Sequence, residues 1–179
     1  MIKYDLYRYG GQTSIFKGLR TPGFKYMFFL RKAAVHKKYS IRGFLYRVIL
    51  SRLGYKYGFQ IPADTSIGEG FYIGHFGTIV INPRAKIGKN CNIAHSVTIG
   101  QANRGKLKGY PVIGDYVWIG TGAVIVGNIN IGSNVLIAPN SFVNIDVPSN
   151  SIVVGNPAQV IQKINATEGY INNILNDKD

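Results

Sequence analysis

Two of the three histidines in this 179-residue chain stand at equivalent places in a repeated pattern. His75 ends the segment "YIGH" and His95 ends "NIAH", so each histidine follows an isoleucine by two positions. A hydroxyl group is a poor nucleophile near neutral pH, and an imidazole with a pKa of about 6.5 can accept its proton as it attacks. The two histidines are therefore candidates for general-base chemistry.

A repeat of six residues explains this spacing. From Ile61 to Val143 an aliphatic residue leads each unit, and the lead returns after six residues in ten of the twelve intervals. The exceptions are an eight-residue unit over 79–86 and an expanded unit over 99–112. A period of six fits neither a helix nor a simple alternating strand, but it is typical of a parallel β-helix in which three short strands form one triangular coil. Thirteen such units predict about four coils.

The register of the repeat places the histidines relative to each other. Ile73 and Ile93 lead units that are three faces apart, so His75 and His95 should occupy the same corner of adjacent coils. Further along the repeat, Thr121 and Pro139 should join the same column. We expect a cleft wall there, along which an extended ligand arm could lie.

The first third of the chain differs in charge. Residues 1–58 contain thirteen Lys and Arg against one acid, Asp5, which gives +12 of the net +13. Apolar stripes within 24–35 and 44–52 predict two helices, with Ser40 as the N-cap of the second, whereas residues 1–23 look loop-like. We therefore divide the chain into a basic helical segment (1–58), a β-helix (59–164) and a tail or short helix (165–179).

The repeat carries a resemblance to a known family. From Gly58 to about Ile164 the chain resembles the left-handed β-helix acyltransferases. Within them it is most similar to serine O-acetyltransferases and to related enzymes that acetylate capsular and exopolysaccharide sugars. The segments that carry the resemblance are "GFQIPADTSIGEGFYIGH", "IVINPRAKIGKNCNI", "SVTIG", "YPVIGDYVWIGTGAVIVGNINIG" and "VVGNPAQVI". It implies a mainly β fold, acetyl transfer from acetyl-CoA to a hydroxyl, no metal, and a homotrimer with active sites between neighbouring β-helices.

The resemblance also implies roles for particular residues. His75 falls on the catalytic histidine of the family. For the cofactor we expect Gly100, Trp118, Gly120, Thr121, Ala138 and Asn156, and for the acceptor Gln60, Asn82, His95, Asn103, Arg104 and Tyr110.

The chain departs from serine acetyltransferases where those enzymes bind the amino acid. Gln60 replaces the aspartate that orients their histidine, and Gly74 replaces the acid before it. Gly109 and Tyr110 replace their Arg-His pair. Free serine needs partners for an ammonium and a carboxylate group, so these uncharged residues favour a sugar hydroxyl on a capsular, exopolysaccharide or lipopolysaccharide precursor. Gln60, Asp64 and a backbone carbonyl all stay open as the group that orients His75.

Several alternatives stay open. The main one is a serine O-acetyltransferase of cysteine biosynthesis, and another is a non-catalytic β-helix scaffold. A γ-type carbonic anhydrase is disfavoured because its zinc needs three histidines and His36 lies outside the repeat.

The single cysteine, Cys91, and the lack of a secretory signal favour a cytoplasmic protein. The basic segment predicts either peripheral contact with the anionic inner face of a membrane or a helical cap on the trimer. Because the positive charge is confined to this segment, nucleic acid is not an expected partner.

Overall fold

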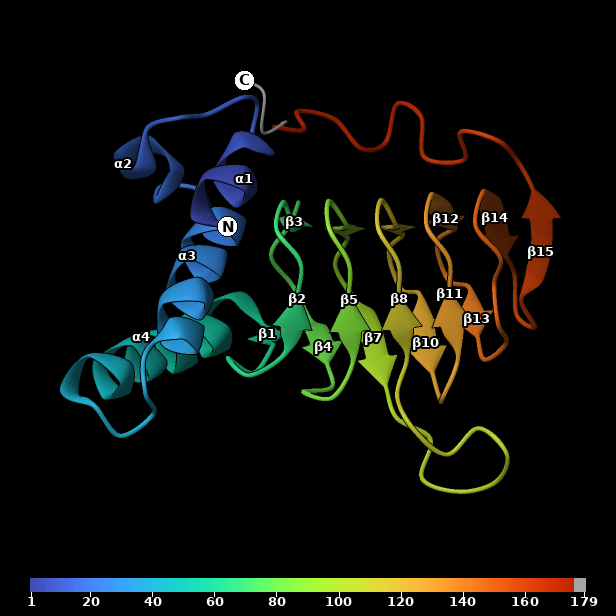
Figure 1. Ribbon diagram of the computed structural model, residues 1–179, viewed down its shortest axis with the longest axis horizontal. Helices are drawn as coiled ribbons and strands as arrows, with labels where there is room; N and C mark the ends of the chain where they lie inside the picture. The colour runs from blue at the N-terminus through green and yellow to red at the C-terminus, as the bar shows by residue number, and fades with distance from the viewer. Residues whose placement is uncertain (176–179) are drawn as a thin grey trace.

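We describe residues 1–175 of a computed structural model, in which a three-sided parallel β-solenoid is covered at one end by helices (Figure 1). The helices are α1 (Ile2–Tyr7), α2 (Ile15–Gly18), α3 (Pro22–Val35) and α4 (Ile41–Tyr57). Sheet A contains β1 (Phe59–Gln60), β4 (Ile79–Ile81), β7 (Val97–Gly100), β10 (Val124–Val126) and β13 (Phe142–Val143). Sheet B contains β2 (Ser66–Ile67), β5 (Lys86–Ile87), β8 (Val112–Ile113) and β11 (Asn130–Ile131). Sheet C contains β3 (Tyr72–Ile73), β6 (Asn92–Ile93), β9 (Trp118–Ile119), β12 (Val135–Ile137), β14 (Ser151–Val154) and β15 (Gln159–Gln162).

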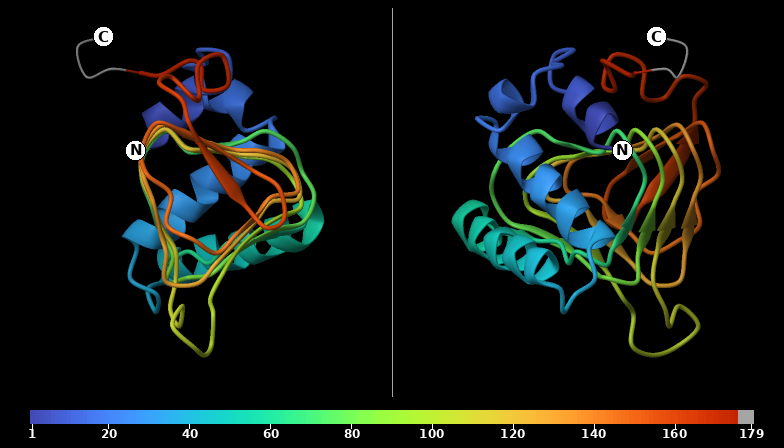
Figure 2. Two further views of the ribbon diagram at one scale, coloured as in Figure 1. Left: turned by 90° about the vertical axis from the view of Figure 1, so that its right-hand side faces the viewer. Right: turned by 60° about the vertical axis from the view of Figure 1, so that its left-hand side comes forward.

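The chain passes from sheet A to B to C in the first four coils, and in the fifth it meets sheet B only at a bridge between Val147 and Ile131. Figure 2 (left) shows the triangular cross-section that results. The leading aliphatic residues point inward and are buried, as the hexapeptide period predicts. Successive strands in each sheet are parallel, and the exception is β15, which pairs antiparallel with β14. The predicted β-helix with an N-terminal helical segment is confirmed.

One detail of the predicted repeat is wrong. In sheet A, Ile81 pairs with Ile99, so the eight-residue unit begins at Ile73 and the two additional residues lie in the turn that carries His75. The prediction had put them after Ile79, because both isoleucines can lead a unit. Both are buried, and strand pairing alone distinguishes them.

The number of coils also differs. Within residues 1–175 the solenoid has five coils where about four were predicted, because the last coil continues beyond Val143, through a bridge at Val147, to β14. Val147 and β14 fall outside the range over which the six-residue lead was counted, which ended at Val143.

The helical segment follows the sequence in part. The two predicted helices are α3 and α4, and the Ser40 side chain accepts a hydrogen bond from the Gly43 amide as the predicted N-cap. The loop prediction for residues 1–23 is wrong, because α1 and α2 form there. Their stability comes from tertiary contacts: Leu6 and Asp5 on α1 are both buried against the rest of the protein.

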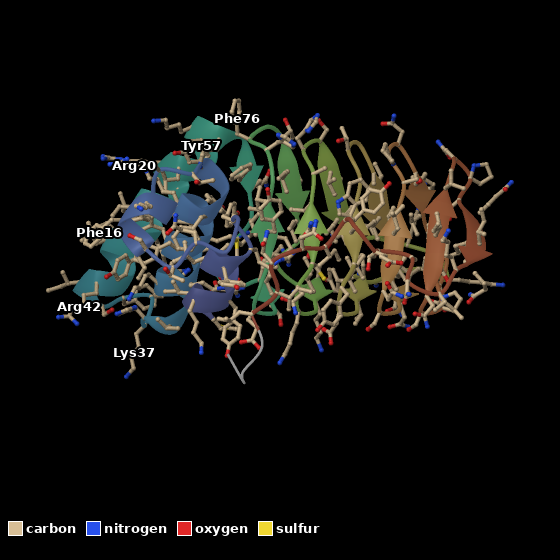
Figure 3. All side chains as sticks on the ribbon, turned by 90° about the horizontal axis from the view of Figure 1, so that it is seen from above. Phe16, Arg20, Lys37, Arg42, Tyr57 and Phe76 are labelled. Carbon is tan, nitrogen blue, oxygen red and sulfur yellow. The ribbon has the colours of Figure 1, made fainter. Side chains whose placement is uncertain are left out.

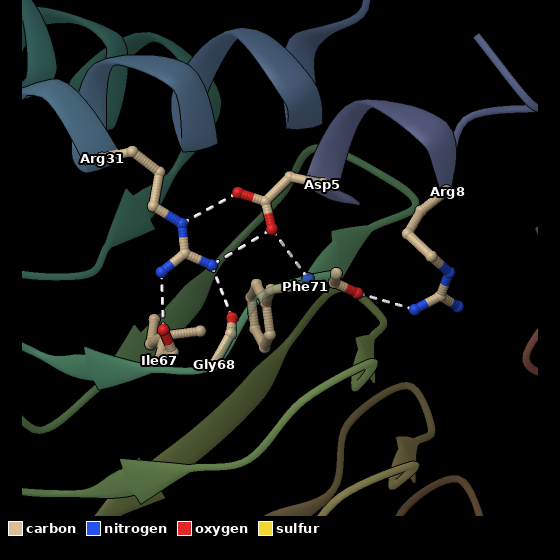
Figure 4. A network of polar contacts seen from close by, with 7 residues as sticks. Asp5, Arg8, Arg31, Ile67, Gly68 and Phe71 are labelled. Atoms are coloured by element: carbon tan, nitrogen blue, oxygen red, sulfur yellow. Dashed lines mark hydrogen bonds and ion pairs between the residues drawn. The ribbon is translucent and has the colours of Figure 1, made fainter. Parts of the chain in front are cut away.

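A buried polar network joins the helices to the first coil (Figure 4). Arg31 forms an ion pair of 2.8 Å with Asp5 and donates hydrogen bonds to the carbonyl oxygens of Ile67 and Gly68. Asp5 accepts a hydrogen bond from the Phe71 amide, and Arg8 donates one to the carbonyl of Gly70. These backbone groups lie at the open edge of the first coil, where no preceding strand can pair with them. The helices therefore cap the solenoid.

The C-terminal segment lies along sheet C as an irregular strap. Tyr170 packs on Trp118 with ring centroids 4.9 Å apart, and Thr167 donates to Asn134 at 2.7 Å. Residues 165–175 contain no helix, so the predicted short helix is absent from this part of the tail. The end of that prediction, residues 176–179, lies outside the described residues.

No helix in residues 1–175 has the length and apolar character needed to cross a bilayer.

Candidate active site

The two histidines share one corner of the solenoid, between sheets C and A. Pairing of Ile73 with Ile93 confirms the predicted register, and the rings of His75 and His95 lie with their centroids 5.9 Å apart in an edge-to-face arrangement. The His75 side chain is exposed, and none of the hydrogen bonds among residues 1–175 involves its ring. Its imidazole is therefore accessible to an incoming hydroxyl group.

His95 lies one coil further along and is half-buried. Its Nδ1 atom is buried without a hydrogen-bond partner among the described residues. A buried polar atom without a partner is costly, so this nitrogen is an unsatisfied polar group beside His75.

The His75 turn, residues 74–78, is positioned by the end of α4. The Gly77 amide donates to the carbonyl of Tyr57 at 2.8 Å, and the Ile79 amide donates to that of Gly58 at 2.9 Å. Gly58 ends the helix in the left-handed region with φ 79°, and a Cβ atom there would lie 2.9 Å from the Gly77 carbonyl carbon. The close approach of helix and turn therefore requires glycine at position 58.

Small residues form a column beside the histidines. In register with one another stand Gly74, Ala94, Gly120 and Ala138, which follow the paired leads of sheet C. Their amides are already used in the ladder, for example from Ala94 to the Ile119 carbonyl at 2.9 Å. These positions therefore carry no large side chain along the corner, and their backbone N–H groups are not available as hydrogen-bond donors.

The next column contains the predicted corner residues in order: His75, His95, Thr121 and Pro139. Asn156 follows β14 at the same corner of the last coil and is exposed. Four of the six predicted cofactor residues, Gly120, Thr121, Ala138 and Asn156, thus lie along one edge that starts at His75.

The other two predicted cofactor residues lie elsewhere. Gly100 ends β7 at the opposite edge of sheet A. Trp118 points outward from sheet C, where Tyr170 of the strap packs on it.

The predicted acceptor residues gather mainly at a second corner, between sheets A and B, where the expanded loop projects from the solenoid (Figure 1). Asn82 donates to Gln101, and Gln101 donates to Asn103. Arg84 donates to the Tyr110 hydroxyl and lies 5.2 Å from the centre of its ring. Arg104 is exposed near the tip of the loop.

Sheet A separates the two corners within one chain. From Thr78 to Asn82 the extended chain covers about 13 Å, so neither Asn103 nor Tyr110 of this chain lies in the His75 turn. The structure therefore brings His75 together with His95 but not with the loop.

Gln60 lines a cavity of about 690 Å³ between α4 and the first strands of sheet A. Thr78, three residues after His75, also lines this cavity, as does Arg47. Asp64, one of the three groups considered for orienting His75, instead pairs with Arg47 at 3.0 Å. None of the three forms a hydrogen bond with the His75 ring within residues 1–175, so the group that orients His75 stays open.

One residue at the His75 turn escaped the sequence analysis. Phe76 is 70% exposed beside His75, and Figure 3 shows it near Tyr57 where the helices meet the first coil. The sequence signal that could have identified Phe76 is an aromatic residue in a turn whose other residues are small or polar. Its ring could pack against an apolar face of a bound acceptor.

The other potential ligands are engaged in the fold. Burial raises the pKa of the Cys91 thiol to about 12, so it is not a nucleophile near neutral pH. Nδ1 of His36 lies 2.8 Å from the carbonyl of Lys32 on α3. Within residues 1–175 no group of three or more His, Cys, Asp or Glu side chains is placed to hold a metal ion.

Comparison with known proteins gives a consistent set of relatives. The family model for bacterial transferase hexapeptide (six repeats) matches residues 110–144. Serine acetyltransferase 2 of Arabidopsis thaliana is 37% identical over 121 residues, which make up 68% of this chain and 38% of that protein. This chain therefore spans less than half of the length of that curated relative.

Two solved structures resemble the chain over most of its length. Soybean serine acetyltransferase complexed with serine is 32% identical with a TM-score of 0.74, over 89% of this chain and 67% of that one. A serine acetyltransferase from Brucella abortus strain S19 in complex with coenzyme A is 29% identical with a TM-score of 0.72, over 90% of this chain and 65% of that one.

Proposed function

Because this chain belongs to the hexapeptide-repeat transferase family and is a homologue of serine acetyltransferases, we propose that it transfers an acetyl group from acetyl-CoA to a hydroxyl group. His75 is the general base in this proposal. The observation that carries it is the exposed imidazole at the start of a corner lined by small residues.

The reaction needs one proton acceptor and one electrophile. His75 takes the proton of the acceptor hydroxyl as the oxygen attacks the thioester carbon. The tetrahedral intermediate then collapses, the carbon–sulfur bond breaks, and the leaving thiolate receives the proton from the imidazolium. The ester and free coenzyme A are the products, and His75 returns to its neutral form.

The corner from His75 to Asn156 is the proposed place for acetyl-CoA. The small column of Gly120 and Ala138 supports this, because it leaves space for a pantetheine arm beside the side chains of Thr121 and Pro139. The relative solved with coenzyme A supports the choice of cosubstrate.

We propose a homotrimer in which the loop of one chain completes the site of its neighbour. The separation of the His75 turn from Tyr110 within one chain supports this arrangement, since a second solenoid alongside can bring its loop to the histidines. Mixing a His75→Ala variant with a Tyr110→Ala variant should restore activity that neither has alone. Failure of the mixture after subunit exchange would place both residues in one chain's site.

Serine is the acceptor that the relatives favour, because they are serine acetyltransferases. The exposed Arg104, Lys106 and Lys108 of the loop are available for its carboxylate.

A sugar hydroxyl is the second candidate, favoured by the uncharged residues near the proposed site. Gln60, Gly74, Gly109 and Tyr110 offer no charged partner for an amino acid. Phe76 and Tyr110 are aromatic and suit the apolar face of a saccharide.

Thiol release from acetyl-CoA tests the activity and separates the two acceptors. The purified chain is assayed with L-serine and with a de-O-acetylated polysaccharide from the source organism, beside a His75→Gln variant. Turnover with serine that is lost in the variant supports the first acceptor, and turnover with the polysaccharide alone supports the second. If neither acceptor reacts and calorimetry detects no acetyl-CoA binding, the chain is a binding scaffold and the proposal is overturned.

A further inference from the structure

The connection between α3 and α4 presents an unusual surface at the helical end of the protein. We define the α3–α4 corner as residues 35–45, which include the end of α3, the connection and the first turns of α4. We propose that this corner docks on the surface of an anionic lipid bilayer.

Large apolar side chains at this corner point into solvent. Five of them are between 54% and 93% exposed: Val35, Tyr39, Ile41, Phe44 and Leu45. A single exposed leucine or phenylalanine is ordinary on a protein surface, but five within eleven residues form a group. Transfer of these side chains from water into an apolar phase would contribute favourable free energy to binding at this corner.

The same eleven residues contain three exposed cations, Lys37, Lys38 and Arg42. Among the Lys and Arg side chains of residues 1–58, Arg31 pairs with Asp5 and Arg47 pairs with Asp64, and the others form no ion pair within the described residues. Asp5 is the one acidic residue in positions 1–58, and it is 1% exposed and paired with Arg31 inside the cap. The outer surface of the helical cap is therefore predominantly cationic.

The corner lies at an extremity of the protein and is free to meet a flat surface. Figure 2 (right) shows α2, α3 and α4 in front of the end of the solenoid, with α4 at the lower edge. In Figure 3, Lys37 and Arg42 project from this end, and Phe16 of α2 and Arg20, which follows α2, project from the same end of the protein. Phe16 is 86% exposed, so α2 offers a second apolar contact.

The pairing of apolar and basic side chains selects a lipid surface over other partners. A second copy of this end would bring two cationic surfaces together, and their repulsion opposes self-association. Nucleic acid would neutralise the bases but would leave Ile41 and Leu45 in water. An anionic bilayer satisfies both, since phosphate groups attract the Lys and Arg heads while the apolar side chains enter the boundary between headgroups and acyl chains.

The proposed trimer would strengthen the contact. With the threefold axis along the solenoids, three copies of the α3–α4 corner face the same direction. Three weak contacts on one membrane then act together, because after the first has bound the others meet the surface at a high effective concentration.

Cosedimentation of the full chain with lipid vesicles tests this inference. The vesicles contain phosphatidylcholine alone or with about 30% phosphatidylglycerol, at about 0.05 M and about 0.5 M salt. We expect binding to the anionic vesicles at low salt and at least a fivefold weaker binding at high salt. No binding to anionic vesicles at low salt would overturn the proposal.

A matched pair of double variants separates the corner from general electrostatics. Lys38→Glu with Ile41→Ser changes the corner, and Lys163→Glu with Ile164→Ser makes the same change in charge and type at exposed residues of the C-terminal strap. We expect the first to weaken vesicle binding at least tenfold and the second to bind like the natural chain. Equal loss in both would assign the binding to net charge alone and contradict a specific corner.

Two controls identify the other occupants. Light scattering over a range of concentrations reports self-association through this end, and a gel shift with single-stranded nucleic acid reports the alternative polyanion. If the chain does not bind vesicles, and the Lys38→Glu, Ile41→Ser double variant weakens self-association or nucleic-acid binding, that partner and not a lipid bilayer occupies the corner. Acetyl transfer is measured in parallel, and unchanged turnover in the first variant shows that its fold is retained.

Discussion

The polar groups at two corners of the solenoid differ in whether they have partners within the protein. At the corner between sheets B and C, which we call the capped corner, Arg31, Asp5 and Arg8 satisfy the backbone groups of residues 67–71. At the corner between sheets C and A, the His75 ring has no hydrogen bond within the described residues and Nδ1 of His95 is buried without one.

The difference distinguishes polar groups that stabilise the fold from polar groups that act on a ligand. Buried polar groups that stabilise a fold have all their partners within the protein. Groups that bind or transform a ligand keep part of their hydrogen-bonding capacity for it, and the protein accepts a cost in stability at that place. Substitutions at the two corners should therefore affect different measurements.

The largest effect expected at the histidine corner is on catalysis. His75→Ala should lower kcat for acetyl transfer by about 10²- to 10⁴-fold, because the attacking hydroxyl loses its general base. Affinity for acetyl-CoA and the melting temperature should change little, since the exposed ring makes no hydrogen bond in the fold. Steady-state kinetics, calorimetry with acetyl-CoA and thermal unfolding measure these three quantities. A large loss of thermal stability would show that the ring has a structural role.

At the capped corner the expected effect is on stability. Arg31→Met should lower the free energy of unfolding by about 3–5 kcal/mol, because the carboxyl group of Asp5, which is 1% exposed, loses its ion-pair partner. Replacing both, with Asp5→Leu and Arg31→Met, should recover part of the loss, since no unpaired charge is then buried. Denaturant unfolding of the three chains measures the effect. A double variant less stable than Arg31→Met would show that the charges themselves hold the carbonyl groups in place.

Cys91 lies at the end of the turn between sheets B and C in the second coil, and its thiol is buried. Its reactivity therefore tests the burial of a reactive group. Its pKa is raised to about 12 by desolvation, so in the folded protein the thiol should react with an alkylating reagent at pH 8 at least about a hundredfold more slowly than after denaturation. The folded state keeps this proton more tightly than the unfolded chain, whose thiol titrates near 9.0. The resulting stabilisation is therefore present below pH 9 and decreases as the pH rises toward 12. Equal reaction rates before and after denaturation would contradict the buried position.

The smallest effect on kcat is expected for His95, and it allows the two histidines to be compared. His95→Ala should lower kcat by less than about tenfold, because His95 lies one coil beyond the proposed base and its ring is half-buried. The variant is assayed beside His75→Ala under the same conditions. If His95→Ala loses more activity than His75→Ala, the general base lies one coil further along the corner.

The sequence alone determined the solenoid and the pairing of its histidines. A six-residue period places one aliphatic residue per face, and every inward position of a stacked coil has the same neighbours, so the lead residues predict both the fold and the alignment of Ile73 with Ile93. The periodicity also located the two expanded segments, although it put the shorter one six residues too late.

Tertiary structure decided what the repeat does not encode. Strand pairing assigns the two additional residues to the His75 turn, because Ile79 and Ile81 are both buried and equally able to lead a unit. The cap depends on Asp5 meeting Arg31, 26 residues away, and on arginine contacts with carbonyl groups of the first coil, which no local pattern reveals. The same holds for the distance between the histidine corner and the loop: each segment is visible in the sequence, but only the folded coil places sheet A between them.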